Sequence, residues 1–181
     1  MAEPQTHPAR RGMMMSGSGA VMGIREDEDV AKAADEAHPG LVAGTLVLTA
    51  DGIFPVELLA PGDRIITRNT GLVALRALMF RQVRGDFVQV RAAALGEARP
   101  QTDTVMAADQ TVLLRGAPAL TLRGQEMVLI RAGDLTALEG CSLLRAIEMT
   151  VVQMVFDQAQ LVYADGLETL CLPPDGGSRV A

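Results

Sequence analysis

Tryptophan is absent from the 181-residue sequence, and aromatic residues make up only 3% of it. This scarcity argues against base-stacking platforms and aromatic cages. The only histidines, His7 and His38, and the only cysteines, Cys141 and Cys171, are spread along the chain without any Cys-x-x-Cys pair, which excludes a zinc framework. A carboxylate site for a harder ion stays open, but no Asp-rich calcium loop is present. We expect neither a metal site nor a cofactor.

Positive charge is also in short supply, because 16 Lys and Arg residues face 22 Asp and Glu residues, for a net charge of −6. Nucleic-acid binding needs a basic face, so nucleic acid is not expected as a partner. The soft apolar stretch Gly12–Ile24 has 13 residues, whereas a membrane-spanning helix needs about 20. No transmembrane segment is therefore expected. The length of 181 residues indicates one domain with a tail, and the hydrophobic share of 49% excludes wholesale disorder.

Residues 1–39 differ from the rest and are expected to form a flexible leader. Glu26–Ala37 contains good helix formers with acidic residues in the first turn, which predicts a short acidic helix. His38 belongs to the Pro-Gly stop signal that would end it. Alternatively, Arg10–Arg11 and the apolar stretch that follows resemble a twin-arginine export signal, with a cleavage site near Ala31–Ala33. The acidic block fits such a signal poorly, so we expect a cytoplasmic protein and keep export as the alternative.

From Leu41 onward, short β-branched runs alternate with turns rich in Gly, Asp and Pro. This rhythm predicts an all-β fold of about ten short strands. Asp51–Gly52 is a strong hairpin signal, and Thr150–Phe156 is expected to form a second hairpin with Leu161–Ala164. The expected strands are Thr45–Ala50, Ile53–Leu59, Arg64–Arg68, Leu72–Val83, Phe87–Arg91, Thr111–Arg115, Met127–Ile130, Thr150–Phe156 and Leu161–Ala164.

Some segments of the body do not fit a strand pattern. Ala92–Ala98 is predicted to be a short helical piece, and Leu135–Leu138 a loop or a single helical turn. Leu72–Val83 could form either a helix or a strand, although its apolar residues recur at every second position, which favours a strand. The domain is expected to cover residues 40–172, and the Pro-, Gly- and Asp-rich residues 173–181 to form a flexible tail.

Short blocks along this β-rich region are informative through their order and spacing rather than one by one. They are Gly44–Thr45 with Thr49 and Asp51–Gly52, Pro55–Leu58, Pro61–Ile65 with Thr67, Asp109–Gly116, Val128–Leu135, Val155–Asp157 and Val162–Gly166. In this order they resemble the Hint domains, the self-processing modules of Hedgehog proteins and inteins, and in particular the bacterial subgroup. The resemblance spans residues 40–172 and implies a compact Hint-like fold of short antiparallel strands.

The resemblance also implies a chemistry. In this family a Cys, Ser or Thr at the first residue of the domain attacks the preceding carbonyl and exchanges the amide for a thioester or ester. A Thr-x-x-His block further along distorts and protonates the departing amide. Water or another nucleophile then resolves the ester.

At each position that carries this chemistry, the present sequence departs from the family. The nucleophile position is Gly40, which has no side chain. Ala107 stands where the Thr-x-x-His block begins and Gln110 where its histidine belongs, and an amide is neither an acid nor a base near neutral pH. Gln153 and Ala159 replace histidines that the bacterial subgroup tends to have. We therefore expect no catalytic residues at Gly40, Ala107 or Gln110.

The sequence thus predicts a degenerate Hint domain that does not cleave itself and acts as a binding or structural module for an unknown protein partner. The alternative is an active autoprocessing domain that cuts near Pro39–Gly40 with a rearranged nucleophile. Thr45 is the nearest hydroxyl, but its place at a strand start favours a structural role. The sequence indicates no oligomeric state.

The remaining reactive side chains are expected to be structural. Cys141, in a loop after Gly140, and Cys171, on a strand, are expected to be buried free thiols rather than displaced nucleophiles or a disulfide. Asp63 and Asp165 stand beside glycine in turns, where carboxylates commonly bond to the local backbone.

Overall fold

The computed structural model describes residues 40–173, and most of them lie in antiparallel strands, which confirms the all-β prediction. The expected leader helix, the export signal and the tail after Pro173 lie outside the described residues. The strands are β1 (Leu41–Val42), β2 (Leu46–Thr49), β3 (Gly52–Pro55), β4 (Arg64–Thr67), β5 (Gly71–Ala74), β6 (Ala77–Val90), β7 (Thr104–Ala107), β8 (Thr111–Arg115), β9 (Met127–Arg131), β10 (Cys141–Val155), β11 (Gln160–Ala164) and β12 (Leu167–Cys171). The helical segments are α2 (Ala117–Arg123) and the short 3-10 helices η1 (Val56–Leu58) and η2 (Ala132–Ala137).

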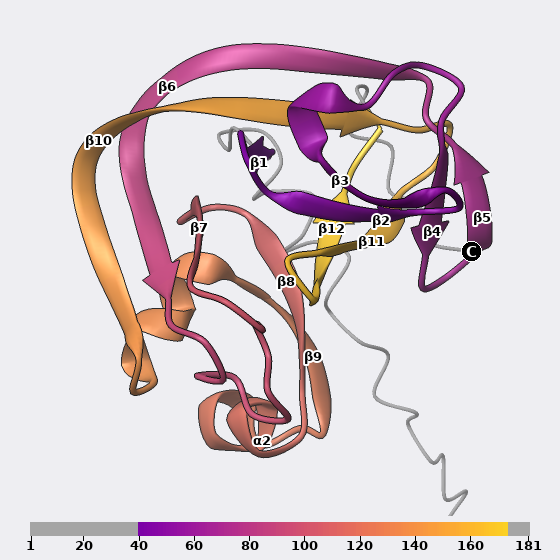
Figure 1. Ribbon diagram of the computed structural model, residues 1–181. Helices are drawn as coiled ribbons and strands as arrows, with labels where there is room; N and C mark the ends of the chain where they lie inside the picture. The colour runs from indigo at the N-terminus through magenta and orange to yellow at the C-terminus, as the bar shows by residue number, and fades with distance from the viewer. Residues whose placement is uncertain (1–39, 174–181) are drawn as a thin grey trace, which may run out of the picture.

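The strands form two sheets (Figure 1). One sheet has the order β1-β10-β6-β7, and the other has the order β3-β2-β4-β11-β12-β8-β9, with β5 added beside β4. The turn at Asp51–Gly52 joins β2 to β3 as an antiparallel hairpin, as the sequence predicts. Because β11 contacts β2, β4 and β12, the second sheet folds around this strand rather than lying flat.

The two longest strands, β6 and β10, pair with each other along almost their whole length. Figure 1 shows them running side by side across the molecule and bending together at one corner. A β-bulge between Leu144 and Ile147 lies in this pair, and bulges bend a strand and increase its twist. At the bulge Ala146 has a φ of 54°, and its N–H donates to Asp86 Oδ1 at 3.1 Å.

The predicted pairing of Thr150–Phe156 with Leu161–Ala164 is wrong. Residues 150–155 are the last part of β10 and pair with β6 and β1, whereas β11 forms its hairpin with β12 across the Asp165–Gly166 turn. Two strands that alternate equally well do not reveal their partners, and the Asp-Gly turn is the stronger signal for a hairpin. The expected strand Leu72–Val83 is also divided between β5 and β6, and Phe87–Val90 continues β6.

One local prediction is wrong, and one helix was not predicted. Ala92–Ala98 forms successive turns instead of a helical piece, because Ala93, Glu97 and Ala98 all adopt positive φ values that a helix does not contain. Helix α2, which was not predicted, has Pro118 in its first turn and Gly124 as a left-handed cap. That Pro-start, Gly-end signature was available in the sequence.

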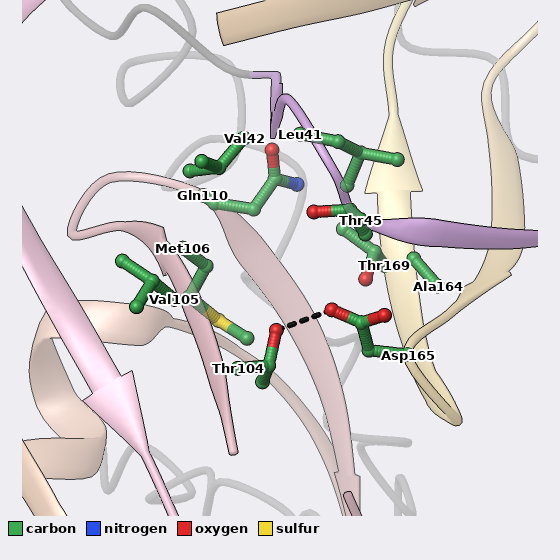
Figure 2. Close-up of a pocket in the computed structure, with 10 residues that line it drawn as sticks. All are labelled: Leu41, Val42, Thr45, Thr104, Val105, Met106, Gln110, Ala164, Asp165 and Thr169. Carbon is green, nitrogen blue, oxygen red and sulfur yellow. Dashed lines mark hydrogen bonds between the residues drawn. The ribbon is translucent and has the colours of Figure 1, made fainter. Parts of the chain in front are cut away.

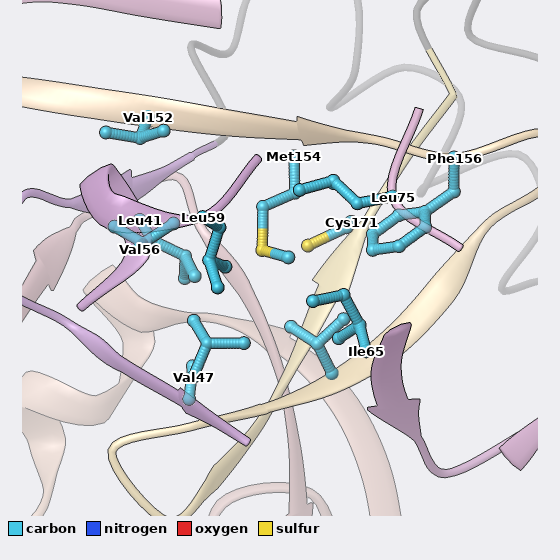
Figure 3. Close-up of a cluster of buried hydrophobic side chains, with 12 residues drawn as sticks. Leu41, Val47, Val56, Leu59, Ile65, Leu75, Val152, Met154, Phe156 and Cys171 are labelled. Carbon is cyan, nitrogen blue, oxygen red and sulfur yellow. The ribbon is translucent and has the colours of Figure 1, made fainter. Parts of the chain in front are cut away.

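Two hydrophobic cores fill the spaces beside the sheets. The first core consists of Leu41, Val47, Val56, Leu59, Ile65, Leu75, Val152, Met154, Phe156, Val162, Ala164 and Cys171 (Figure 3). The second core consists of Val88, Val90, Leu95, Met106, Val112, Leu114, Ala119, Val128, Ile130, Ala132, Leu135 and Leu167. Strand β12 contributes to both cores, through Leu167 and Cys171, and therefore ties them together.

Candidate functional site

The structure brings Gly40 and Gln110 into direct contact. Gly40 is buried just before β1, which pairs with β10 through Leu41 and Val152. Its N–H donates to Gln110 Oε1 at 2.9 Å, across 70 residues of sequence. Gln110 lies in the turn between β7 and β8 and is only 1% exposed.

All of the carboxamide of Gln110 is used in this contact and two others. Its Nε2 donates to the carbonyl of Leu170 at 2.8 Å and to that of Thr111 at 3.0 Å. A carboxamide offers both an acceptor and two donors, so it satisfies three backbone groups at once. Gln110 thereby joins the start of the domain to β8 and β12, a bridging role that requires no proton transfer.

Ala107 ends β7 on the same turn, since its carbonyl accepts the Gln110 N–H at 3.0 Å. It is 4% exposed and packs in a small apolar cluster with Phe87 and Val151. The methyl group of Ala107 makes no hydrogen bond. Gly40, Ala107 and Gln110 therefore lie close together, at the start of β1 and the turn after β7.

Val151 on β10 fills the space that a side chain at position 40 would need. An ideal Cβ built on Gly40 would lie 2.4 Å from Val151 Cγ1 and 3.1 Å from the Val152 carbonyl oxygen. Side-chain Cβ atoms essentially never approach another heavy atom as closely as the first distance. Valine is stiff at χ1, so it cannot simply turn aside. This contact has no signature in the sequence, because Val151 is one of several apolar residues in a strand.

A small pocket opens beside the contact between Gly40 and Gln110 (Figure 2). Its polar lining consists of Thr45, Thr104, Gln110, Asp165 and Thr169, and its apolar lining of Leu41, Val42, Val105, Met106 and Ala164.

Asp165 organises one side of this pocket. Its Oδ2 accepts a hydrogen bond from the Thr104 hydroxyl, and its Oδ1 accepts one from the Leu46 N–H at 2.8 Å. The expectation that Asp165 bonds to nearby backbone is therefore wrong, since both partners are distant in sequence. Asp63 does behave as expected, because its carboxylate accepts the N–H of Ala60 at 2.8 Å within the same turn.

Thr45 borders the pocket with its side chain while its backbone is held in place. Its N–H donates to the Val42 carbonyl at 3.0 Å, and its own carbonyl accepts the Val56 N–H at 2.9 Å. The residue is 8% exposed. Thr45 therefore has a structural backbone role and also presents its side chain to the same pocket as Gln110.

The other sequence candidates lie elsewhere. Gln153 accepts a hydrogen bond from the Arg81 guanidinium at 3.1 Å on the exposed β6–β10 pair. Ala159 is buried, and its carbonyl accepts the Asn69 amide. Neither lines the pocket beside Gly40.

Both cysteines are free thiols. Cys171 is buried on β12, and burial raises its pKa to about 12. Cys141 is half-buried, and burial likewise raises its pKa; it begins β10 and does not lie in a loop as expected. A reactive thiol needs a lowered pKa, so neither residue has the character of a nucleophile.

Within residues 40–173, no group of three or more His, Cys, Asp or Glu side chains is arranged to hold a metal ion. Over the same residues, no helix has the length and apolar character needed to cross a membrane.

Comparison with known proteins gives a consistent picture. A family model described as the Hint domain matches residues 39–175. The solution structure of a bacterial intein-like domain from Clostridium thermocellum has a TM-score of 0.53 at 18% identity, and the match covers 75% of this chain and 99% of that one. The crystal structure of the TvoVMA intein has a TM-score of 0.52 at 11% identity, and the match covers 72% of this chain and 96% of that one. No significant match was found among curated protein sequences.

The two solved structures establish the shared fold, and the family model extends over most of the chain. This chain belongs to the Hint domain family.

Proposed function

We propose that this chain is a Hint domain that has lost self-cleavage and serves as a binding or structural module. The observation that carries the proposal is the packing at Gly40. The position that would present the nucleophile has no side chain, and Val151 Cγ1 occupies the space where one would begin. Without an attacking atom, the covalent route of the family has no first step.

Gln110 supports the same conclusion. Its amide oxygen accepts the N–H of Gly40, and its amide nitrogen donates to two carbonyls, so the residue stabilises the scaffold. It cannot deliver a proton to a departing amide near neutral pH. With Ala107 beside it, neither family acid–base position carries a group that titrates.

The competing function is self-cleavage by a rearranged nucleophile. It draws support from the pocket beside Gly40, where the side chains of Thr45, Thr104 and Thr169 lie together with Gln110. Thr45 is the candidate of this group nearest in sequence to the Pro39–Gly40 bond. Asp165, the one titratable residue that lines the pocket, accepts hydrogen bonds from the Thr104 hydroxyl and the Leu46 N–H. It therefore contacts Thr104 rather than Thr45, and no described base accepts a hydrogen bond from the Thr45 hydroxyl.

Intact-mass spectrometry of the purified full-length chain tests the proposal. We expect a single species of about 19.1 kDa that persists through prolonged incubation with or without dithiothreitol. Fragments that break at Pro39–Gly40 would overturn the proposal. If their formation also stopped in Thr45→Val, which keeps the shape and removes the hydroxyl, the rearranged mechanism would be established.

A reconstructed variant provides the positive control. It combines Gly40→Cys, Ala107→Thr and Gln110→His with Val151→Ala, which opens space for the new side chain. We expect dithiothreitol to release a fragment from this variant. The same three changes with Val151 retained should cleave more slowly, because the thiol cannot take its place beside the backbone.

A further inference from the structure

A row of apolar side chains crosses the outer face of β3, β2, β4 and β5. Leu48 on β2 pairs with Ile53 on β3, and Ile66 on β4 pairs with Leu72 on β5. The antiparallel pairing of β2 with β4 brings Leu48 beside Ile66. Directly paired residues share one face of a sheet, so the four side chains form one continuous stripe across four strands.

The stripe faces away from the first core. Successive side chains of a strand point to opposite faces, and Val47 and Ile65, which precede Leu48 and Ile66, are fully buried in that core. On the opposite face, Ile53 is 62% exposed and Leu72 is 54% exposed. Exposed apolar side chains that form a contiguous patch mark a surface that contacts something else.

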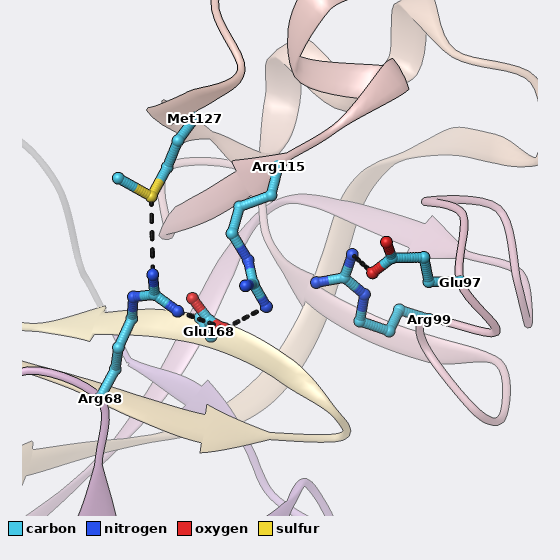
Figure 4. A network of polar contacts seen from close by, with 6 residues as sticks. All are labelled: Arg68, Glu97, Arg99, Arg115, Met127 and Glu168. Atoms are coloured by element: carbon cyan, nitrogen blue, oxygen red, sulfur yellow. Dashed lines mark hydrogen bonds and ion pairs between the residues drawn. The ribbon is translucent and has the colours of Figure 1, made fainter.

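Tyr163 on β11 extends the stripe and Glu168 on β12 ends it. Because β11 pairs with both β2 and β4, the half-buried ring of Tyr163 lies beside Leu48 and Ile66. Tyr163 pairs in turn with Glu168, whose Oε1 accepts from the Arg68 guanidinium at 3.3 Å (Figure 4). The stripe is therefore bounded on this side by an ion-paired cluster.

The first 39 residues of the chain contain a segment that matches this surface. Gly12–Ile24 has four methionines together with Val21 and Ile24, and methionine adapts to irregular apolar surfaces. Four acidic residues, Glu26–Asp29, follow almost at once. On β4, at the border of the stripe, Arg64 is exposed and makes no ion pair within residues 40–173. The segment and the surface are thus complementary in both hydropathy and charge.

The connection between the segment and the domain is long enough to reach the stripe. The domain begins at Gly40, and the six residues from there to Leu46, next to the stripe on β2, span at most about 20 Å. Residues 25–39 reach about 50 Å when extended, and about 25 Å if they include the helix expected for Glu26–Ala37. Such a tether keeps the segment at about millimolar local concentration, which favours it over a second copy of the chain in dilute solution.

We propose that Gly12–Ile24 packs against the stripe of the same chain, which consists of Leu48, Ile53, Ile66, Leu72 and Tyr163. Burial of the methionine and aliphatic side chains stabilises the contact, and the acidic residues that follow lie toward Arg64. The stripe shares no residue with the pocket beside Gly40, so its occupation does not depend on the side chains that line that pocket.

Tyrosine fluorescence tests the contact in the full-length chain, because Tyr163 is the only tyrosine and tryptophan is absent. Acrylamide quenching measures how accessible this ring is. Met14→Asp combined with Val21→Asp places two charges in the segment, where burial against an apolar surface is costly, and should raise the quenching constant at least about twofold. Ala2→Asp combined with Ala9→Asp adds the same charge outside the segment and should leave the quenching constant unchanged.

A variant of the stripe tests the other side of the contact. Leu72→Asp should raise the quenching constant to a similar extent, whereas Leu120→Asp should not, because Leu120 is a comparably exposed leucine (49%) on α2, outside the stripe. Leu72→Asp should add little to the Met14→Asp and Val21→Asp change, because both remove the same contact. The ¹H–¹⁵N backbone spectrum of each variant verifies its fold.

Three results would refute the proposal. They are an unchanged quenching constant in the segment variant, an equal rise in the Ala2→Asp and Ala9→Asp control, and a quenching constant that falls as the protein concentration rises. The first would mean that the segment leaves the stripe open to solvent or to another protein. The last, with a dimer in sedimentation equilibrium, would identify a second copy of the chain as the occupant.

Discussion

Gly40 packs so closely against β10 that adding a single methyl group, in Gly40→Ala, tests whether Val151 excludes a side chain from this position. Gly40→Ala places a carbon 2.4 Å from Val151 Cγ1, and the neighbouring Val152 carbonyl oxygen closes the other side. We expect this variant to lose about 1–3 kcal/mol of unfolding free energy, as overpacked cores do. Urea denaturation measures the loss.

A double-mutant cycle with Val151→Ala assigns the cause. In the Val151→Ala background the extra cost of Gly40→Ala should fall below about 1 kcal/mol, because the clashing methyl is gone. Gly85→Ala on β6 is the matched control, since its nearest neighbour, Val83 Cγ1, is at an ordinary 3.7 Å. Additive costs in the cycle would mean that Val151 does not oppose a side chain at position 40.

At the scale of a single element, the β-bulge in the β6–β10 pair contains Ala146. The residue is exposed and holds a φ of 54°, which an alanine adopts only with strain. Ala146→Gly should therefore raise the unfolding free energy by about 0.5–1 kcal/mol. Thermal or urea denaturation detects the change.

The control for this variant is Ala74→Gly in β5, where the strand is regular. There the added backbone freedom of glycine should lower stability by about 0.5–1 kcal/mol. The same sign at both positions would contradict the assignment of strain to the bulge.

The turns of this fold could be predicted from the sequence, whereas the partners and lengths of its strands could not. Turn chemistry is local, so Asp51–Gly52 correctly predicted the β2–β3 hairpin. Strand partners and strand lengths are set by contacts far apart in sequence, so neither the continuity of β6 nor the pairing of β10 could be inferred from alternation. The candidate site was also predicted only in part. The motif spacing pointed to Gly40 and Gln110, which do make contact. The contact of Val151 with position 40 arises from tertiary packing and has no signature in the sequence.

At the scale of the whole molecule, the two cores share strands and should unfold together. Strand β10 begins with Cys141, which packs against the second core, and continues to Met154 in the first. Strand β12 runs from Leu167 in the second core to Cys171 in the first. Loss of either core would leave both strands half unsupported, so no stable intermediate is expected.

The two native thiols report on the two cores separately. Burial raises the pKa of both, to about 12 for Cys171, so each is protonated and slow to alkylate at pH 8. Unfolding returns both to an ordinary thiol pKa of about 8.5 and exposes them. Pulse alkylation with iodoacetamide across a urea series, read by mass spectrometry, should give one midpoint for Cys141 and Cys171. Separate midpoints would show that the cores unfold independently.

The methyl group of Val151 also constrains the evolutionary paths open to this chain. A lineage that regained a cysteine at position 40 would first pass through an overcrowded, less stable protein, unless residue 151 had already become smaller. A reactive side chain at position 40 is therefore accommodated most easily when residue 151 becomes smaller first. On the proposal that self-cleavage was lost, this contact makes the reaction harder to regain, because a reactive side chain at position 40 and a smaller residue at position 151 are needed together.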